Sequence, residues 1–530
     1  MRTLKLSVPE QSSGENPRLE LRIAEIRHRL ESLPFADAGQ ACTRALAQLK
    51  EYNRSRLSLT NRYEILQEFT IIYDRMLLDY LSVLFHELQN RHPPQRDLLI
   101  ELTHEMAFGY KNVLLEQSRK KGLLPAASKI QVTTLYHALK FITLGMQFRA
   151  ANQEPPAKRS WLEFYQVYQY ALKKKLHLKN FKLLKIDGTH ETLTLETVFR
   201  QTVLHALFDP YRLSRAQSWA LHFILGDPDL VCPINRLNAE EINDDSYLIN
   251  LEEDRRPLPS ALVADLLRAE AQLVIRPSEV IRALNQEQLY VEKRLRTTLP
   301  VNIVDKVLPI AKFTVREVTH NLLRRRIKRS KRTPCSGSLT LYLGLASAYE
   351  ALTAQAAVSS SEINNTQWQH RDDHSSILGF QCQIMNATQG GLGIRLHTDY
   401  PNLFPGLPVY IQVAAGMNHE DVPHDAVSLV RWAMKTGPGV WTLGLQHIAY
   451  KVLPIRLRAT NSNSLDGYWQ SGLYLDNQTG IHSILSPPNM YQAERIYEIE
   501  FPNDVQDARA TLSYDNTSHF DWFKIIHPEQ

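Results

Sequence analysis

Hydrophobic positions repeat with a helical period through the first part of the chain. From about residue 17 to residue 225, apolar residues recur at spacings of three and four, as in LELRIAEIRHRLESL and YEILQEFTIIYDRMLLDYLSVLFHEL. The second segment is apolar on nearly every side, which predicts a central helix of a bundle, and Ser58 and Thr60 before it offer a helix start. The polar stretches NRHPPQRD, KKGLLPAAS and ANQEPPAK separate the helices of this all-α region.

The pattern changes between residues 226 and 310. GDPDLVCPINRLNAEEINDD is rich in loop formers, SYLINL predicts a short strand, and two further helices are expected in LPSALVADLLRAEAQLV and PSEVIRALNQEQLYVEKRLRTTL. We assign this part to the helical N-terminal domain, residues 1–310. Within that domain, KKKLHLKNFKLLK at 173–185 predicts an amphipathic helix with a solvated lysine face, with a nucleic-acid contact as the alternative.

A strand pattern replaces the helical one after residue 332. SLTLYLGLASAYEAL opens as a strand, and the polar tract VSSSEINNTQWQHRDDHSS predicts a surface loop. Strands then follow about ten residues apart in ILGFQCQIMNA, LGIRLHT, LPVYIQVAAG, AVSLVRWAMK and VWTLGLQHIA, with the turn TGPG before the last. Short strands at this spacing predict a small antiparallel barrel or sandwich.

The same pattern continues to the end of the sequence, in LPIRLRATN, YWQSGLYLD, GIHSILSPP, RIYEIEFP and ARATLSYDN. These strands form either a β extension packed on the barrel or a separate small sheet. The expected fold class is therefore multidomain α + β. An all-α N-terminal domain (1–310) is followed by a small antiparallel β-barrel (311–452) and a C-terminal β extension (453–530).

Composition agrees with several ordinary domains. A chain of 530 residues, 43% apolar and 22% charged, has a globular composition and exceeds what one core holds. It has no apolar run long enough for a membrane span or a signal peptide, so we expect a cytoplasmic protein without membrane insertion. The four cysteines lack metal-binding spacing and are expected mostly as buried thiols.

Positive charge is concentrated in one place. Residues 324–332 read RRRIKRSKR, and removing their seven charges from the net charge of +5 leaves −2 on the rest of the chain. A protein that coats nucleic acid usually spreads its basic residues over a face or along a helix, whereas one dense cluster indicates a compact anionic partner. A solvated basic linker is the alternative.

Two motifs flank the first predicted strand of the barrel. Arg325 and Arg329 stand in RxxxR spacing, and MNATQGGLGIRL contains Asn386, Thr388 and Gly391 in the form N-x-[ST]-x-x-G. With LFPGLPVYIQV, AVSLVRWAMK and WTLGLQHI following in order, residues 315–452 resemble the PilZ domain family of receptors for the bacterial second messenger cyclic di-GMP. The signatures of that family are RxxxR before the first strand and [DN]xSxxG between the next two.

The resemblance implies cyclic di-GMP as ligand, no cofactor, and ligand-binding roles for Arg325, Arg329, Arg332, Asn386, Thr388 and Gly391. The chemistry agrees with it, because each guanine presents O6 and N7 side by side, an edge that arginine meets with two parallel hydrogen bonds. Asn386 can bond a guanine edge or brace the turn, Thr388 offers a hydroxyl, and Gly391 permits close backbone approach. None of these groups can attack a bond or move protons, so we expect binding and no enzymatic activity.

The match departs from the family pattern in two ways. Thr388 replaces the usual serine, and the long gap between the motifs leaves open whether Arg329, Arg332 or the Lys328/Arg332 pair fills the second arginine position. Ordinary turn chemistry is the alternative for Asn386 and Thr388.

Other candidate sites are weaker. Arg431 and Trp432 lie on a strand that could flank the ligand, but we expect Trp432 in the core. His370 and His374, in HRDDH, suggest a metal site, for which a solvated loop is the preferred interpretation, so no metal is expected. No hydrolase, zinc-protease or P-loop motif is present.

We therefore expect a cyclic di-GMP receptor that couples ligand binding at the barrel to the arrangement of its helical domain. That domain would dock on an unidentified protein partner. The resemblance to long PilZ proteins suggests regulation of motility or type IV pili. The alternatives are an interaction adaptor that binds no nucleotide and an RNA- or DNA-binding protein. A nucleic-acid partner is not expected, because no aromatic residues are interleaved with the cations at 324–332.

Overall fold

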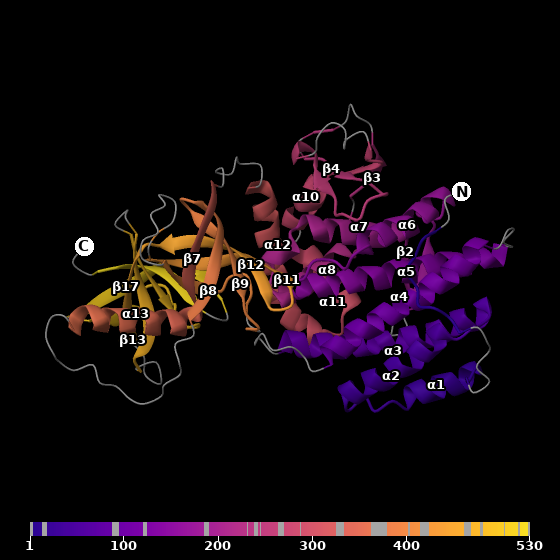
Figure 1. Ribbon diagram of the computed structural model, residues 1–530, viewed down its shortest axis with the longest axis horizontal. Coiled ribbons are helices and arrows are strands. Elements are labelled where there is room, and N and C mark those ends of the chain that lie inside the picture. Colours follow the sequence, from indigo (N-terminus) through magenta and orange to yellow (C-terminus); the bar gives the residue numbers. More distant parts are fainter. Residues whose placement is uncertain are drawn as a thin grey trace. The chain divides into compact units, whose positions relative to one another are not determined.

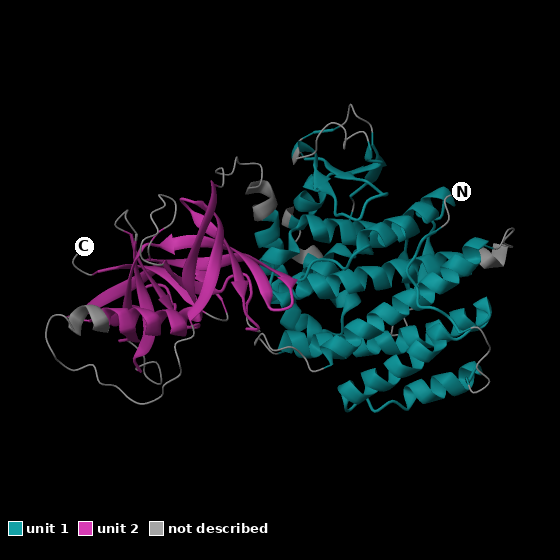
Figure 2. Ribbon diagram, in the orientation of Figure 1, with its two compact units in different colours: residues 1–327 teal, residues 328–530 magenta. Residues whose placement is uncertain are grey.

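The computed structural model divides the chain into two compact units, residues 1–327 and residues 328–530 (Figure 2). The structure describes residues 4–12, 19–86, 95–119, 125–184, 190–230, 232–237, 242–243, 245–262, 270–286, 288–324, 333–361, 379–400, 403–413, 423, 425–460, 468–477, 481–502, 504–517 and 520–527. Each unit has its own hydrophobic cores, and each is described by itself.

The first unit is built mainly from helices (Figure 1). They are α1 (Ile23–Glu31), α2 (Ala38–Arg54), α3 (Leu59–His86), α4 (Arg96–Arg119), α5 (Pro125–Ala151), α6 (Ser160–Lys173), α7 (Leu195–Leu207), α8 (Arg215–Leu225), α10 (Ser278–Gln286), α11 (Gln288–Thr298) and α12 (Val301–Arg324). One large cluster of buried apolar side chains joins these helices. The predicted helical N-terminal region is confirmed.

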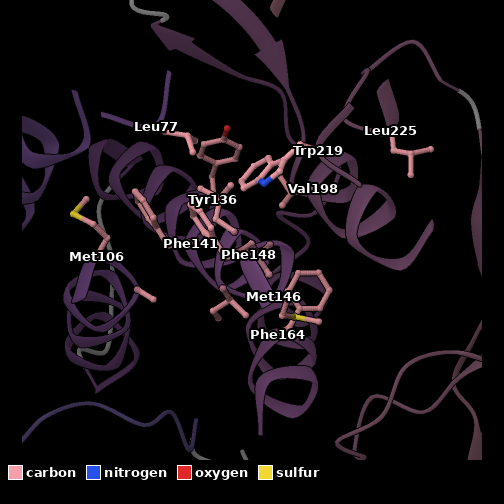
Figure 3. Packing of buried hydrophobic residues seen from close by; sticks show 14 of the residues in the cluster. Leu77, Met106, Tyr136, Phe141, Met146, Phe148, Phe164, Val198, Trp219 and Leu225 are labelled. Carbon is pink, nitrogen blue, oxygen red and sulfur yellow. The ribbon is translucent and has the colours of Figure 1, made fainter. Parts of the chain in front are cut away.

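The predicted central helix is α3. Its first turn is capped by Ser58, whose side-chain oxygen accepts a hydrogen bond from the backbone N–H of Asn61 at 3.1 Å. Aromatic residues fill the core beside it, as Figure 3 shows for Phe141 and Phe148 of α5 and Trp219 of α8. The rings of Phe148 and Trp219 meet edge to face with centroids 5.0 Å apart, a favourable aromatic geometry.

An N-terminal strap, residues 4–12, runs along this unit over a buried ion pair. Lys111 on α4 donates to Oε2 of Glu163 on α6 at 2.5 Å, and both side chains are less than a tenth exposed. The other carboxylate oxygen, Oε1, accepts from the backbone N–H of Ser7 at 2.9 Å and from its hydroxyl. The strap therefore supplies hydrogen bonds that a buried carboxylate needs.

Short strands complete the first unit. β1 (Phe181–Leu184) and β2 (His190–Leu193) form an antiparallel hairpin, and β3 (Ile234–Arg236), β4 (Tyr247–Ile249), β5 (Leu258–Pro259) and β6 (Leu273–Ile275) form a sheet in the order β3-β6-β4-β5. The amphipathic helix predicted over 173–185 is wrong, because α6 ends at Lys173 and β1 begins at Phe181. Two alternating apolar positions of a hairpin produced the helix-like spacing.

The second unit opens with an antiparallel barrel. Its strands are β7 (Thr333–Leu343), β8 (Gly379–Thr388), β9 (Gly391–His397), β10 (Pro408–Val413), β11 (Asp425–Gly437) and β12 (Val440–Ala449). They close in the order β7-β8-β9-β12-β11-β10, with β10 paired back to β7. Helix α13 (Gly344–Ser361) lies between β7 and β8 in the chain, where the sequence predicted a continuing strand and a loop.

The C-terminal strands form a second closed barrel, where the sequence predicted a β extension or a separate small sheet over 453–530. The strands are β13 (Lys451–Ala459), β14 (Gln470–Asn477), β15 (Ile481–Ser486), β16 (Ile496–Phe501), β17 (Asp504–Asn516) and β18 (Asp521–Ile526). Their order is β13-β14-β15-β18-β17-β16, with β16 paired back to β13. The closing pair is distant in sequence, so local patterns do not reveal it.

Candidate ligand-binding face of the first barrel

The β8–β9 hairpin brings three of the predicted site residues together. Thr388 and Gly391 face each other as the last pair of the two strands, and Gln389 and Gly390 form the turn between them. Asn386 lies two positions before Thr388 and pairs with Gly393. The spacing N-x-T-x-x-G is thus the spacing of a two-residue hairpin with its flanking positions.

A β-bulge turns Asn386 to the outside of the barrel. Ile384 pairs with Ile394 and Asn386 with Gly393, so Met385 is an extra residue in β8. Ile384 and Ala387 point into the core, while Met385 and Asn386 in succession stay outside it. Strict alternation would place Asn386 inside.

A second bulge, on β11, places Trp432 on the outside of the barrel. Val430 pairs with Leu445 and Trp432 with Gly444, which leaves Arg431 as the extra residue. Val430 and Ala433 are core residues, and Trp432 is only partly buried. The expectation that Trp432 is a core residue is therefore wrong, because the bulge moves it to the outer face beside Arg431.

Asn386 and Trp432, each next to a bulge, lie on either side of two glycines. Strand pairing places Asn386, Gly393, Gly444 and Trp432 in one row across β8, β9, β12 and β11. A β-carbon on Gly393 would lie 2.6 Å from Oδ1 of Asn386, and one on Gly444 would collide with the indole of Trp432. The missing side chains thus let an amide and an indole lie against the backbone.

The turn is held against the end of β12. A β-carbon on Gly391 would collide with the carbonyl oxygen of Leu445, so the two strands approach as closely as glycine allows. The backbone N–H of His447 donates to the carbonyl of Gly390 at 3.1 Å, and the Tyr450 hydroxyl donates to the carbonyl of Gln389 at 2.6 Å. These bonds fix both residues of the turn to the strand that carries Gly444.

The polar side chains of the hairpin differ in how much hydrogen-bonding capacity they keep for a ligand. Thr388 Oγ1 donates to the carbonyl of Gly391 at 3.2 Å, which is the turn-bracing role that the sequence left open. Its oxygen can still accept a hydrogen bond. Among the described residues, no hydrogen bond is made by the side-chain amide of Asn386. A part-buried amide without such a partner suits a ligand that offers both donor and acceptor.

Positive charge borders this face. Arg395 on β9 is exposed and lies two positions from Gly393, on the same side of the strand. On β11, Arg431 donates through Nε to Oε1 of Gln446 at 2.6 Å. Arg395 and Arg431 therefore place two guanidinium groups at the border of this face.

The first strand of the barrel, which follows the Arg-rich segment in the chain, begins beside the same residues. Thr333 follows that segment directly in the chain and pairs with Ala387, and Pro334 pairs with Asn386. Arg325, Arg329 and Arg332 themselves lie outside the described residues. Arg329 and Thr333 are four positions apart in the sequence, a chain length of at most about 14 Å.

Sequence reasoning missed part of this face. Gly393, Gly444 and Arg395 were not singled out, although alternating glycines in GGLG and a glycine at the centre of WTLGLQ mark positions where a neighbouring group approaches the backbone. The candidate metal residues His370 and His374 lie outside the described residues.

His447 supports the turn from the inner side of the barrel. Its Nδ1 lies 2.8 Å from Oγ of Ser428, and burial lowers the pKa of its imidazole to about 4. At neutral pH His447 is therefore uncharged and acts as a structural residue below the hairpin.

Within the described parts of the chain, no helix has both the length and the apolar character needed to cross a membrane.

One family model matches the chain. It is described as the N-terminal domain of the cyclic-di-GMP receptor FimW, and it matches residues 24–227. The matched stretch begins in α1 and ends after α8, so it lies within the helical unit and does not reach either barrel. None of the curated proteins matches this chain.

Proposed function

We propose that this protein is a cyclic di-GMP receptor in which the first barrel is a PilZ-type barrel. Two separate parts of the chain support the proposal. The helical unit matches a family model described by that ligand. The barrel carries the Asn386, Thr388 and Gly391 hairpin beside Thr333 and Pro334, which follow the Arg-rich segment in the sequence.

The row formed by Asn386, Gly393, Gly444 and Trp432 carries the proposal. It places the Asn386 amide and the Trp432 indole against the buried backbone of Gly393 and Gly444 on the outer face of the barrel, with Arg395 at its border. A flat, aromatic, hydrogen-bonding and anionic ligand fits a face of this kind, and cyclic di-GMP has all four properties. A guanine stacks on the exposed part of the Trp432 ring, because base–aromatic stacking tolerates many geometries.

The remaining side chains contact different parts of the ligand. Asn386 accepts from the N1–H and N2–H of a guanine or donates to its O6, and Arg325, Arg329 and Arg332 supply bidentate contacts to guanine edges and charge for the phosphates. Arg395 adds a fixed cation on the barrel side. No group in this set is a nucleophile or a titrating base, so the proposed activity is binding and not catalysis.

The helical unit is the proposed output. Ligand neutralises the like charges of residues 324–332 and orders them against the barrel, and the unit on the other side of this segment changes its arrangement in response. We propose that this unit docks on a protein partner in the cytoplasm, in the regulation of motility or type IV pili.

Calorimetry on the full chain tests the proposal. The wild type, Arg329→Ala and Asn386→Leu are titrated with cyclic di-GMP, with Arg44→Ala as an exposed-arginine control on α2. We expect the control to match the wild type and Arg329→Ala to bind roughly 10- to 100-fold more weakly, as the loss of charge-assisted hydrogen bonds predicts. Absence of binding by the wild type, equal binding by Arg329→Ala, or displacement of the ligand by random RNA would contradict it.

A further inference from the structure

The two barrels are copies of one topology. If the strands of each barrel are lettered a to f in chain order, both close as a-b-c-f-e-d. β8, β9, β12 and β11, which carry the candidate site, correspond in the second barrel to β14, β15, β18 and β17. The second barrel can therefore be compared with the first, strand by strand.

The outer face that binds in the first barrel is buried in the second. Ile484 and Phe523 point into the second barrel, so the alternate positions Leu473, Leu475 and Leu485 point outward. These leucines are nonetheless fully buried, in a cluster with Val427 and Leu429 of β11. The first barrel therefore covers the outer face of the second barrel that corresponds to the candidate ligand-binding face.

Helix α13 completes this cover. It packs against β7 and β10 of the first barrel and against β13 and β14 of the second. Ala348, Ala351 and Leu352 are its buried residues in the shared cluster. An apolar face under a helix and a barrel offers no charge or open amide to a dinucleotide.

The second barrel also lacks the cationic approach. Nine residues with seven positive charges precede β7, whereas Tyr450 alone separates β12 from β13. The connection that corresponds to the ligand hairpin is Asn477-Gln478-Thr479-Gly480, in which glycine follows threonine directly instead of three residues later. The motif spacing of the first barrel is not kept.

The single linking residue is bonded to the candidate site. Tyr450 donates its hydroxyl to the carbonyl of Gln389 at 2.6 Å, in the hairpin turn. Along β12, Gly444 and Gln446 lie at the site, and the successive residues Ile448 and Ala449, at a register shift with β11, are buried in the cluster between the barrels. Tyr450 follows directly, so site, interface and link are consecutive along one strand and its end.

We infer that the second barrel has the fold of the first barrel but binds no ligand on the corresponding outer face, because that face is buried against the first barrel. The second barrel responds, through Tyr450, to the presence of ligand at the site on the first barrel. This inference rests on the proposed function for the ligand. Movement of the Gln389–Gly390 turn on binding changes the Tyr450 bond and, with it, the packing of β14 and β15 against the first barrel. Ligand thus binds at the first barrel, and the second barrel changes its packing in response.

The first experiment needs no ligand. Hydrogen exchange is measured on the full chain for the wild type, Tyr450→Phe and the control Tyr514→Phe, an exposed tyrosine of β17. We expect faster exchange at residues 389–392 and at β14 and β15 in Tyr450→Phe alone. Exchange equal to that of the wild type at both places would overturn the link.

The second experiment adds cyclic di-GMP. Tyr450→Phe is expected to bind about 2- to 10-fold more weakly than the wild type, the range for loss of one neutral hydrogen bond. Asn386→Leu is expected to lose the binding of the whole chain. Residual binding of the wild-type stoichiometry in Asn386→Leu would overturn the assignment of a single barrel site. Absence of binding by the wild type would overturn the proposed function, while the exchange experiment still decides the link.

Discussion

The indole of Trp432 lies on the backbone of Gly444, at the place where any other residue would carry its side chain. The contact depends on the bulge at Arg431, which brings Trp432 out of the core and opposite this glycine. The ring lies against the backbone of Gly444 and is only partly buried.

Replacing Trp432 tests the stacking role of that ring. Trp432→Ala is expected to weaken cyclic di-GMP binding by about 1–3 kcal/mol, the usual value of a base–aromatic stack. Calorimetry on the full chain measures this, with Trp469→Ala, a tryptophan of the second barrel, as control. Equal affinities of wild type and Trp432→Ala would contradict a stacking role.

The hairpin glycines offer a matched pair of substitutions. A β-carbon at Gly391 would meet the Leu445 carbonyl, whereas one at Gly390 has nothing within 4 Å. Gly391→Ala is therefore expected to destabilise the first barrel by about 1–3 kcal/mol through overpacking. Gly390→Ala should change stability by less than about 0.5 kcal/mol. Denaturant unfolding compares the two, and equal stabilities would show that the strands do not approach so closely.

The buried pair Lys111–Glu163 predicts a strongly destabilising single substitution. Glu163→Gln leaves the Lys111 ammonium buried without its counter-charge, which is expected to cost about 3–5 kcal/mol in the free energy of unfolding. The double variant Lys111→Met/Glu163→Gln should recover most of that loss. Breaking the exposed pair Lys50–Glu101 with Glu101→Gln should cost about 1 kcal/mol or less. Similar losses in the two single variants would contradict the burial of the α4–α6 pair.

Lowering the pH is expected to destabilise the helical unit before it affects exposed parts of the structure. Burial lowers the pKa of His205 to about 4 and that of His222 to about 3, from an ordinary value of about 6.5. Between pH 6.5 and pH 4 these histidines are protonated in the unfolded state but remain neutral in the folded state. The unit is therefore most stable above about pH 6.5 and loses stability as the pH falls toward 4. The loss from His205 is roughly 3 kcal/mol once the pH is below about 4.

Hydrogen exchange of α7 and α8 at pH 7 and pH 5, corrected for intrinsic rates, measures this effect. A His205→Gln variant should show a smaller change between the two pH values. An unchanged pH dependence in that variant would contradict the role of this histidine.

Local patterns sufficed for much of the fold but failed where strands depart from regular alternation. The period of three and four found the helical unit, and even the cap at Ser58, because both signals are local. The bulges at Met385 and Arg431 change which side chains face outward without changing residue type, so alternation assigned Trp432 to the core. Closure of β13 on β16 joins residues about 40 apart, which no local pattern specifies.

Helix α13 was missed for a different reason. Most of its sequence, LASAYEALTAQAA, is rich in alanine, a strong helix former, but the helix follows the strand β7 directly. The apolar run was therefore assigned to the strand. The hairpin, in contrast, was located correctly as a turn between strands, since the threonine-to-glycine spacing is itself the geometry of a short β-turn.

The bulge at Met385 has a consequence for how such a face arises. Because Met385 is an extra residue, its removal would leave Ile384, Asn386 and Ala387 in the alternating order inside, outside, inside, with every other pair of β8 and β9 retained. The insertion therefore adds an outward side chain next to Asn386 and leaves the faces of the residues before and after it unchanged. A closed barrel can in this way widen its outer surface at one point without exchanging a core residue for a surface one.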